Sequence, residues 1–567
     1  MQGEGDGPRR DIPQPGVAPG MWGSDAVADV LRSLEIPYLA LNPGASFRGL
    51  HDSIVNRLGN SQPQLLLCLH ELAAVSIAQG FAKVTDRAMA VALHANVGLL
   101  NGSMGIFNAW CDRAPMLVIG ATGPVDAALR RPWIDWIHTA RDQGALVRGF
   151  TKWDDQPASA QAAQESILRA WQFTNSVPRG PTYVCLDAAM QEQKLEAPLA
   201  AIDARRYLPP PPAAPGREAM QSALTLLASA RRPVILAGRG SRDEQAWRNR
   251  VALAERSGAR VLTDLKTAAV FPTDHPLHAC AAAYLPNQEY VAALNAADLV
   301  LSLDWVDLGG TLAQAGAPSA KIIHVSCDAH LHRGWSMDYQ ALPALDAYLQ
   351  CDPDAALPHL LNALPARSTD SAQSARSLAP SGPLAPLAQA IESAAGGPVC
   401  LVRAPLGWHG DLRAFRHPLD YLGLDGGGGI GSGPGIAVGA ALALMGSGRI
   451  PVALLGDGDY LMGVQALWTA AHYRIPLLIV VCNNRSFGND EAHQERIARA
   501  RGRPVENRWI GQHIRDPEAD ICALARGLGC EAIGPVQNAV EIASAIATAM
   551  QRVRAGAACV VDLRVEY

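Results

Sequence analysis

The sequence predicts an α/β protein built from three doubly wound parallel-sheet domains. Short apolar runs alternate with stretches of helical spacing along most of the chain, which is the order of strands and crossover helices in parallel sheets. A chain of 567 residues is also too long for a single hydrophobic core. Proline-rich and polar stretches divide it into parts of domain size.

The predicted boundaries follow these changes in composition. A run of four prolines marks a stiff, extended linker, and a later stretch rich in Ser, Ala and Arg marks a flexible one. The expected segments are a disordered tail (1–20), a first domain (21–190), a linker (191–215), a middle domain (216–364), a second linker (365–383) and a last domain (384–567).

The overall composition is that of an ordinary globular protein, with 49% hydrophobic and 18% charged residues. A net charge of -5 gives no reason to expect nucleic acid or an anionic membrane as a partner. Eleven cysteines are scattered singly, without a Cys-x-x-Cys pair, which indicates buried thiols in a reducing compartment. The first twenty residues lack the apolar segment of a signal peptide. We therefore expect a cytoplasmic protein.

Short apolar runs in the first domain are its expected strands, and they lie at residues 38–41, 64–68, 88–93, 116–119 and 182–186. In a doubly wound sheet, functional side chains gather just past the carboxyl ends of the strands. The residues found there are Asn42, Pro43, Gly44, Ala45, Glu71, His94 and Asn96. By themselves they also fit a turn, a charged helix cap and a structural histidine.

The middle domain repeats the α/β pattern, with strands expected at residues 233–237, 260–262, 299–303 and 321–325. Gly238-Arg239-Gly240 follows the first of these strands and could form a nucleotide-binding turn. The longer glycine fingerprint of such turns is absent, so the signal is weak.

The last domain holds the pattern that organises the site. Gly456-Asp457-Gly458-Asp459 follows the apolar run 451–455, and after helical spacing over 462–473 a second apolar run, 477–482, ends at Asn483-Asn484. A right-handed crossover brings the carboxyl ends of both strands to one rim, so Asp457 and Asn484 become neighbours. Their oxygens suit Mg²⁺ if a ligand such as a phosphate supplies more. Gly456 and Gly458 would let the backbone approach a diphosphate closely.

This segment resembles the diphosphate- and metal-binding signature of thiamine diphosphate enzymes. The similarity extends over nearly the whole chain and is greatest to the 2-oxo-acid decarboxylase and acetolactate synthase superfamily, in the style of the benzoylformate decarboxylases. It implies that Asp457, the Asn484 side chain and the Ser486 carbonyl bind Mg²⁺. It also implies that the coenzyme is bound by Asn42, Pro43, Gly44, Gly428, Ile430, Gly456, Gly458 and Asp459.

The same resemblance implies two catalytic residues. Glu71 would hydrogen-bond the pyrimidine ring of thiamine diphosphate and so favour the ylide, while His94 would move protons at the substrate. The expected reaction is attack on a 2-oxo acid and loss of CO₂ to give an enamine, which is then protonated or adds to a second carbonyl. The enzyme would be a homodimer or homotetramer with each active site across the dimer interface.

Some positions depart from the family pattern. Benzoylformate decarboxylases have a serine where this chain has Ala45, and acetolactate synthases have Gly-Pro-Gly where it has Asn96-Val97-Gly98. The candidates for the substrate pocket are Ala45, Asn96, Asp490 and His493, and the last two could equally be solvated surface. Residues 403–408 lack the hydroxyls expected for the diphosphate, and residues 130–153 match no motif.

These departures leave alternatives open. One is an acetolactate-synthase-like carboligase, with FAD possible but not favoured. Another is a lyase acting on a 2-hydroxy ketone or a 2-hydroxyacyl thioester. From a different class, a non-catalytic binding protein that kept the fold is disfavoured by the presence of Glu71, Asp457 and Asn484 together.

Overall fold

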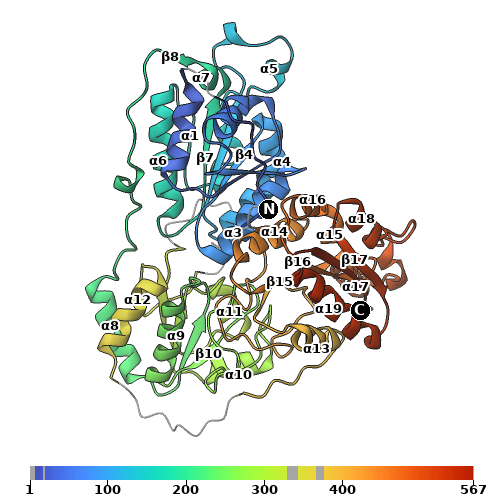
Figure 1. Ribbon diagram of the computed structural model, residues 1–567. Coiled ribbons are helices and arrows are strands. Elements are labelled where there is room, and N and C mark those ends of the chain that lie inside the picture. The colour runs from blue at the N-terminus through green and yellow to red at the C-terminus, as the bar shows by residue number, and fades with distance from the viewer. Residues whose placement is uncertain (1–6, 17–19, 329–341, 366–375, 566–567) are drawn as a thin grey trace.

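The computed structural model describes residues 7–16, 20–328, 342–365 and 376–565. It contains three parallel sheets, each covered by helices, so the predicted fold class is confirmed. In Figure 1 the first domain is blue and teal, the middle domain green and yellow, and the last domain orange and red. The first and last domains meet along α3 and α14, and the middle domain lies beneath them in this view.

The first domain has a six-stranded parallel sheet in the order β3-β2-β4-β5-β7-β6. The five predicted strands are all present, and β6 was not predicted. The strands are β2 (Tyr38–Leu41), β3 (Gln64–Leu67), β4 (Ala90–Leu93), β5 (Met116–Thr122), β6 (Asp154–Asp155) and β7 (Pro181–Asp187). The helices are α1 (Gly23–Ser33), α2 (Arg48–Asp52), α3 (Glu71–Thr85), α4 (Ala95–Cys111), α5 (Ile134–Ile137), α6 (Ala160–Asn175) and α7 (Ala188–Glu192).

The middle domain has a five-stranded parallel sheet in the order β10-β9-β11-β12-β13. Its first four strands match the predicted ranges, and β13 is additional. The strands are β9 (Pro233–Ala237), β10 (Arg260–Leu262), β11 (Leu299–Leu303), β12 (Lys321–Val325) and β13 (Ala347–Leu349). The helices are α8 (Arg217–Ser229), α9 (Glu244–Ser257), α10 (Gln288–Ala296), α11 (Leu308–Gln314) and α12 (Pro353–Ala363).

The last domain has a five-stranded parallel sheet in the order β14-β15-β16-β18-β17. The strands are β14 (Val399–Arg403), β15 (Ile450–Gly456), β16 (Leu477–Asn483), β17 (Glu531–Val536) and β18 (Ala558–Arg564). The helices are α13 (Ala385–Ala394), α14 (Gly433–Leu444), α15 (Asp457–Gly463), α16 (Ala466–His472), α17 (Gly488–Ala500), α18 (Ile521–Gly527) and α19 (Ala539–Arg554).

The crossover between β15 and β16 differs from the single helix predicted over 462–473. It contains two short helices, and Asp457 to Asp459 open α15 instead of forming a loop. At the end of α15, a Cβ on Gly463 would lie 2.1 Å from the backbone oxygen of Gly431, in the preceding glycine loop. This close approach requires glycine and accompanies the break between the helices.

Two of the segments outside the domains form specific contacts through their described residues. In the predicted tail, Arg9 donates its backbone N–H to the Tyr473 carbonyl at 2.9 Å, and the Asp11 carbonyl accepts from Asn60 at 2.8 Å. In the predicted first linker, Lys194–Leu195 (β8) pairs with Met21–Trp22 (β1). Residues 366–375 of the second predicted linker lie outside the described residues. Long-range contacts, which composition does not report, hold the described parts of the tail and the first linker.

Small residues allow α3 and α14 to pack with their backbones in contact. A Cβ on Gly80 would lie 2.1 Å from the Ile436 oxygen, and one on Gly439 would lie 1.9 Å from the Ile77 oxygen. Side chains of both helices share one buried core. This packing fixes the first domain's α3, which begins at Glu71, against the last domain.

Two further expectations concern the chain as a whole. All eleven cysteines lie within the described residues and are free, and all but Cys111 are buried. Within the part of the chain that the structure describes, no helix is both long enough and apolar enough to cross a bilayer.

Candidate active site

Glu71 and His94, the two predicted catalytic residues, both lie close to Gly98. A Cβ built on Gly98 would lie 3.2 Å from Oε1 of Glu71 and 3.3 Å from Cβ of His94. Glu71 is the first residue of α3, is 7% exposed, and accepts a hydrogen bond from Nδ2 of Asn101 at 3.2 Å. The predicted convergence of strand ends β3 and β4 therefore brings these side chains together.

His94 is held at one ring nitrogen. Its Nδ1 lies 2.8 Å from Oγ of Ser46 and 3.4 Å from the Ser46 backbone nitrogen. Its ring also contacts His138, with centroids 4.6 Å apart and planes at 79°. Burial, and after it the nearby His138 and Arg131, lowers the pKa of His94 to about 4. The imidazole is therefore neutral at neutral pH.

The predicted loop after β2 surrounds this histidine. A Cβ on Gly44 would lie 2.2 Å from Cβ of His94, so glycine is required here by His94 itself. Asn42 donates from Nδ2 to the Cys68 carbonyl at 3.0 Å, while Pro43 and Ala45 are exposed. Ala45 has no hydroxyl, but the next residue, Ser46, has one, and this hydroxyl contacts His94.

Asn96 links α4 to the segment that matched no motif. Its Nδ2 donates to the Ile137 carbonyl at 3.2 Å, and its buried Oδ1 has no hydrogen-bond partner among the described residues. Residues 131–139 thus fold over His94. An unpaired buried acceptor beside this histidine is suited to a donor group on a ligand.

Three side chains of this group were not predicted from the sequence, namely Ser46, Asn101 and His138. Ser46 follows directly after the predicted loop, so a search one residue further would have found it. His138 lies 44 residues after His94, in a segment without a recognisable pattern. Its contact with His94 depends on tertiary structure alone.

The last domain brings together the predicted metal-binding residues. Oδ2 of Asp457 and Oδ1 of Asn484 both accept from the backbone N–H of Ser486, at 3.0 and 3.2 Å. The adjacency predicted from the crossover is confirmed. Asp457 is 3% exposed, and its pKa is raised by burial, with backbone N–H groups opposing that rise.

This group fits Mg²⁺ bound together with a ligand. Asp457 forms no ion pair with a side chain in the described ranges, so its buried carboxylate calls for a cation. A Cβ on Gly456 would meet only open space, which leaves room beside the carboxylate. Among the described residues, no three His, Cys, Asp or Glu side chains cluster as metal ligands. A hard cation would then need ligand oxygens to complete its shell.

A buried charge network holds the predicted coenzyme loop, residues 425–433. Arg403 lies between two carboxylates, 2.6 Å from Asp425 and 3.3 Å from Asp459. Oδ1 of Asp459 accepts from the backbone N–H groups of Gly431 and Gly433, at 2.6 and 3.2 Å. Asp459 was predicted to bind the coenzyme, and in the structure its carboxylate holds this loop.

The same loop presents two further predicted coenzyme residues, Gly428 and Ile430. Gly428 has a φ of +66° and open space at its Cβ position. Ile430 is 41% exposed, so its apolar side chain is available to a ligand or a second chain. The start of this domain, where hydroxyls were expected, instead carries Arg403, whose ion pairs are with the two aspartates of this network.

Two predicted substrate-pocket residues lie apart from this network. Asp490 and His493 are exposed on α17, and His493 is hydrogen-bonded to Arg496 of the same helix at 2.5 Å. Neither forms a hydrogen bond with Asp457 or Asn484 in the described part of the chain. The alternative of solvated surface describes both side chains in this structure.

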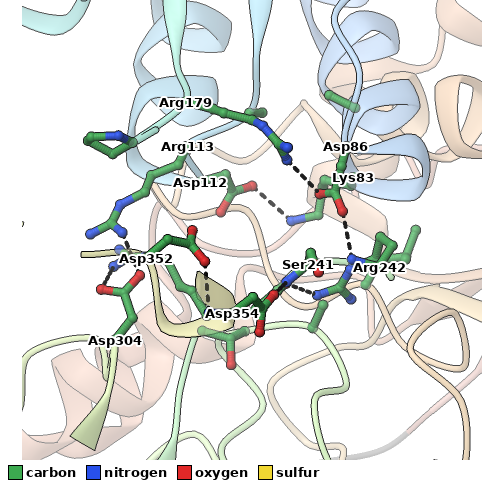
Figure 2. Close-up of a pocket in the computed structure, with 18 of the residues that line it drawn as sticks. Lys83, Asp86, Asp112, Arg113, Arg179, Ser241, Arg242, Asp304, Asp352 and Asp354 are labelled. Atoms are coloured by element: carbon green, nitrogen blue, oxygen red, sulfur yellow. Dashed lines mark hydrogen bonds and ion pairs between the residues drawn. The ribbon is translucent and has the colours of Figure 1, made fainter. Parts of the chain in front are cut away.

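A separate cavity of about 1140 Å³ lies where the three domains meet, and the Gly238-Arg239-Gly240 turn borders it. Figure 2 shows that its basic side chains face aspartates. Lys83 lies 2.8 Å from Asp112, Arg179 lies 3.6 Å from Asp86, and Arg113 pairs with Asp304. Because these cations are already neutralised, the walls offer no clear excess of positive charge for a phosphate ligand.

Family models match all three domains of the chain. They are described as the N-terminal TPP binding domain, the central domain and the C-terminal TPP binding domain of thiamine pyrophosphate enzymes. They match residues 21–146, 220–350 and 406–563, respectively.

Curated proteins and solved structures give the same result. The chain is 28% identical to a benzoylformate decarboxylase of Pseudomonas aeruginosa over 82% of its own length and 86% of the relative. It is 26% identical to an acetolactate synthase large subunit of Corynebacterium glutamicum over 94% and 85%. The structure of a thiamine diphosphate-dependent 4-hydroxybenzoylformate decarboxylase from Rhodococcus jostii RHA1 superimposes with a TM-score of 0.77, at 23% identity over 96% and 99%.

Proposed function

Because the chain belongs to the thiamine pyrophosphate enzymes, we propose that it is a thiamine diphosphate-dependent C–C lyase that decarboxylates a 2-oxo acid. Both curated relatives named above are enzymes of 2-oxo-acid or acetolactate chemistry by name. The observation that carries the proposal is the pair Asp457 and Asn484, whose side-chain oxygens accept from one backbone amide. The Asp457 carboxylate is buried and has no side-chain ion-pair partner in the described ranges. Glu71 and His94 on the first domain supply the acid–base groups.

Each residue has a defined part in this proposal. Asp457, Asn484 and the Ser486 carbonyl would hold Mg²⁺, and the loop through Gly428 and Ile430 would contact thiamine diphosphate. When bound, the coenzyme supplies the carbon nucleophile and electron sink that 2-oxo-acid cleavage requires. Glu71 would hold a proton at the coenzyme's ring, and His94 would hold one near the substrate oxygen.

The assembly belongs to the same proposal. Val97, Leu100 and Met104 are exposed apolar residues on one face of α4, next to Glu71 and Asn101. A face of this kind beside a site is typical of an interface between subunits. We infer a cytoplasmic homodimer or homotetramer in which a second copy covers this face and completes each site. No FAD is included, because the cavity between the domains has no signature for it beyond the weak glycine turn.

A product analysis tests the proposal. The purified protein is incubated with thiamine diphosphate, Mg²⁺ and a panel of aliphatic and aromatic 2-oxo acids, and CO₂ and aldehyde are measured. Coenzyme-dependent release of both from at least one acid supports a decarboxylase. No CO₂ from any acid, in protein that binds the coenzyme, contradicts it.

A carboligase is the second candidate, favoured by the similarity to the acetolactate synthase over 94% of the chain. Acetolactate formed from pyruvate, with no free aldehyde, would select it. Cleavage of a 2-hydroxyacyl thioester or 2-hydroxy ketone in the absence of CO₂ release would instead select the lyase alternative. The products distinguish the three reactions in one experiment.

A further inference from the structure

The contacts of His94 distinguish its two ring nitrogens. Oγ of Ser46 lies 2.8 Å from Nδ1, and the Ser46 backbone N–H points to the same nitrogen at 3.4 Å. A backbone N–H group can only donate a hydrogen bond. Nδ1 is therefore placed as an acceptor in a neutral imidazole, which leaves the ring proton on Nε2.

The Ser46 hydroxyl is itself oriented by its neighbours. Its Oγ accepts from the backbone N–H of Ala95 at 3.2 Å, which favours donation of the hydroxyl proton toward Nδ1. Ser46 is 5% exposed, and its carbonyl accepts from Nε2 of Gln191 at 2.9 Å. The short Ala45–Phe47 turn (η1) that carries Ser46 is therefore fixed from both sides.

The surroundings keep the His94 ring neutral, and only a neutral imidazole has two possible tautomers. Burial and the nearby His138 and Arg131 lower the pKa of His94 to about 4. Arg131 is paired with Asp135 at 2.8 Å, and Glu71 and His94 both lie close to Gly98. No carboxylate forms an ion pair with His94 in the described ranges, so nothing there stabilises an imidazolium.

We propose that Ser46 is a positioning residue that holds His94 as its Nε2–H tautomer, so that the site offers the substrate a neutral N–H donor. The substrate group that fits such a donor is an oxygen of the 2-oxo acid, either its carbonyl or its carboxylate. This inference rests on the proposed function for the identity of the substrate. The tautomer itself is a property of the protein alone.

The tautomer is measured by two-bond ¹H–¹⁵N correlation spectra of protein labelled with ¹⁵N-histidine, with coenzyme and Mg²⁺ but no substrate. A His94→Gln spectrum identifies the His94 signals. We expect the wild-type Nδ1 to have the shift of an unprotonated ring nitrogen and Nε2 that of a protonated one. A proton on Nδ1 in the wild type overturns the proposal.

Two variants of Ser46 link the tautomer to activity. Ser46→Ala should give mixed tautomers and lower kcat/KM by about tenfold, while Ser46→Thr, which keeps the hydroxyl, should retain the wild-type spectrum. Ser103→Ala is the matched control, because the Ser103 hydroxyl on α4 donates only to its own helix, at 2.6 Å from the Leu99 oxygen. An unchanged His94 spectrum in Ser46→Ala also overturns the proposal.

The outcome separates this inference from the proposed function. If the wild-type tautomer is the expected one but no 2-oxo acid reacts, the proposed function fails and the assignment of Ser46 stands. If a 2-oxo acid reacts but Nδ1 carries the proton, the role of Ser46 is wrong and the function stands.

Discussion

Asp457 and Asn484, which are 27 positions apart in the sequence, accept hydrogen bonds from the same backbone N–H group, that of Ser486. One carboxylate oxygen and one amide oxygen are thereby held side by side at the rim of the last sheet. Parallel pairing of β15 with β16 produces this arrangement, because both strands end at the same edge. The predictions below follow from it and from the contacts of His94 and Arg403.

We expect Asp457→Asn to weaken activation by Mg²⁺ by about tenfold or more, because the amide cannot supply the negative charge that a buried divalent cation requires. The measurement is the Mg²⁺ concentration at half-maximal activity with thiamine diphosphate in excess. Asp490→Asn is the control, since Asp490 is exposed on α17. Equal Mg²⁺ dependence in both variants would exclude Asp457 as a ligand.

Substitution of Arg403 by Met should destabilise the protein by about 3–5 kcal/mol, because the buried Asp425 and Asp459 lose their shared cation. Thermal and denaturant unfolding measure the loss. Replacement of both aspartates by Asn in the same variant should restore part of it. Arg169→Ala, which removes an exposed helical pair with Glu165, should cost less than about 1 kcal/mol. A similar loss in both single variants would refute the network's importance.

Gly44→Ala should displace His94, because the new Cβ would lie 2.2 Å from the His94 Cβ. We expect a loss of about 1–3 kcal/mol in stability. We also expect kcat to fall with little change in coenzyme affinity, measured by steady-state kinetics and calorimetry. Gly527→Ala is the matched control, since its Cβ position is open. Full activity in Gly44→Ala would show that His94 does not need its observed position.

The lowered pKa of His94 predicts a dependence of stability on pH. The ordinary value is 6.5 and the folded value is about 4, so in that window the unfolded chain binds more protons than the folded one. The stabilisation from neutral His94 is therefore present above pH 6.5 and is lost as the pH falls to about 4. Thermal midpoints should fall less steeply across this window in His94→Gln than in the wild type. His493→Gln, at an exposed site, should leave the slope unchanged.

The proximity of residues could be predicted from the sequence where a regular crossover connects them. It could not be predicted where only tertiary packing brings them together. Asp457 and Asn484 follow the parallel strands β15 and β16, and the handedness of the connection between these strands fixes where both of them end. Glu71 and His94 follow β3 and β4, which both pair in parallel with β2 and therefore end at the same edge of the sheet. The adjacency of Asp457 and Asn484 therefore follows from the sequence pattern.

The remaining contacts depend on irregular segments. His138 reaches His94 from a stretch without periodicity, and Arg403 serves the coenzyme loop through Asp425 and Asp459, where hydroxyls were expected. Arg9 contacts the last domain although composition indicated a disordered tail. The composition of a segment indicates whether it tends to be exposed to solvent. It does not indicate which residue will form a hydrogen bond with a particular backbone group.

The most direct test of the central claim is calorimetric titration of thiamine diphosphate into the purified protein, with Mg²⁺ present and with Mg²⁺ removed by a chelator. We expect saturable binding at one site per chain with Mg²⁺, and its loss both on chelation and in Asp457→Asn. Absence of binding with Mg²⁺ present, or binding that is indifferent to both the metal and Asp457, would contradict the account.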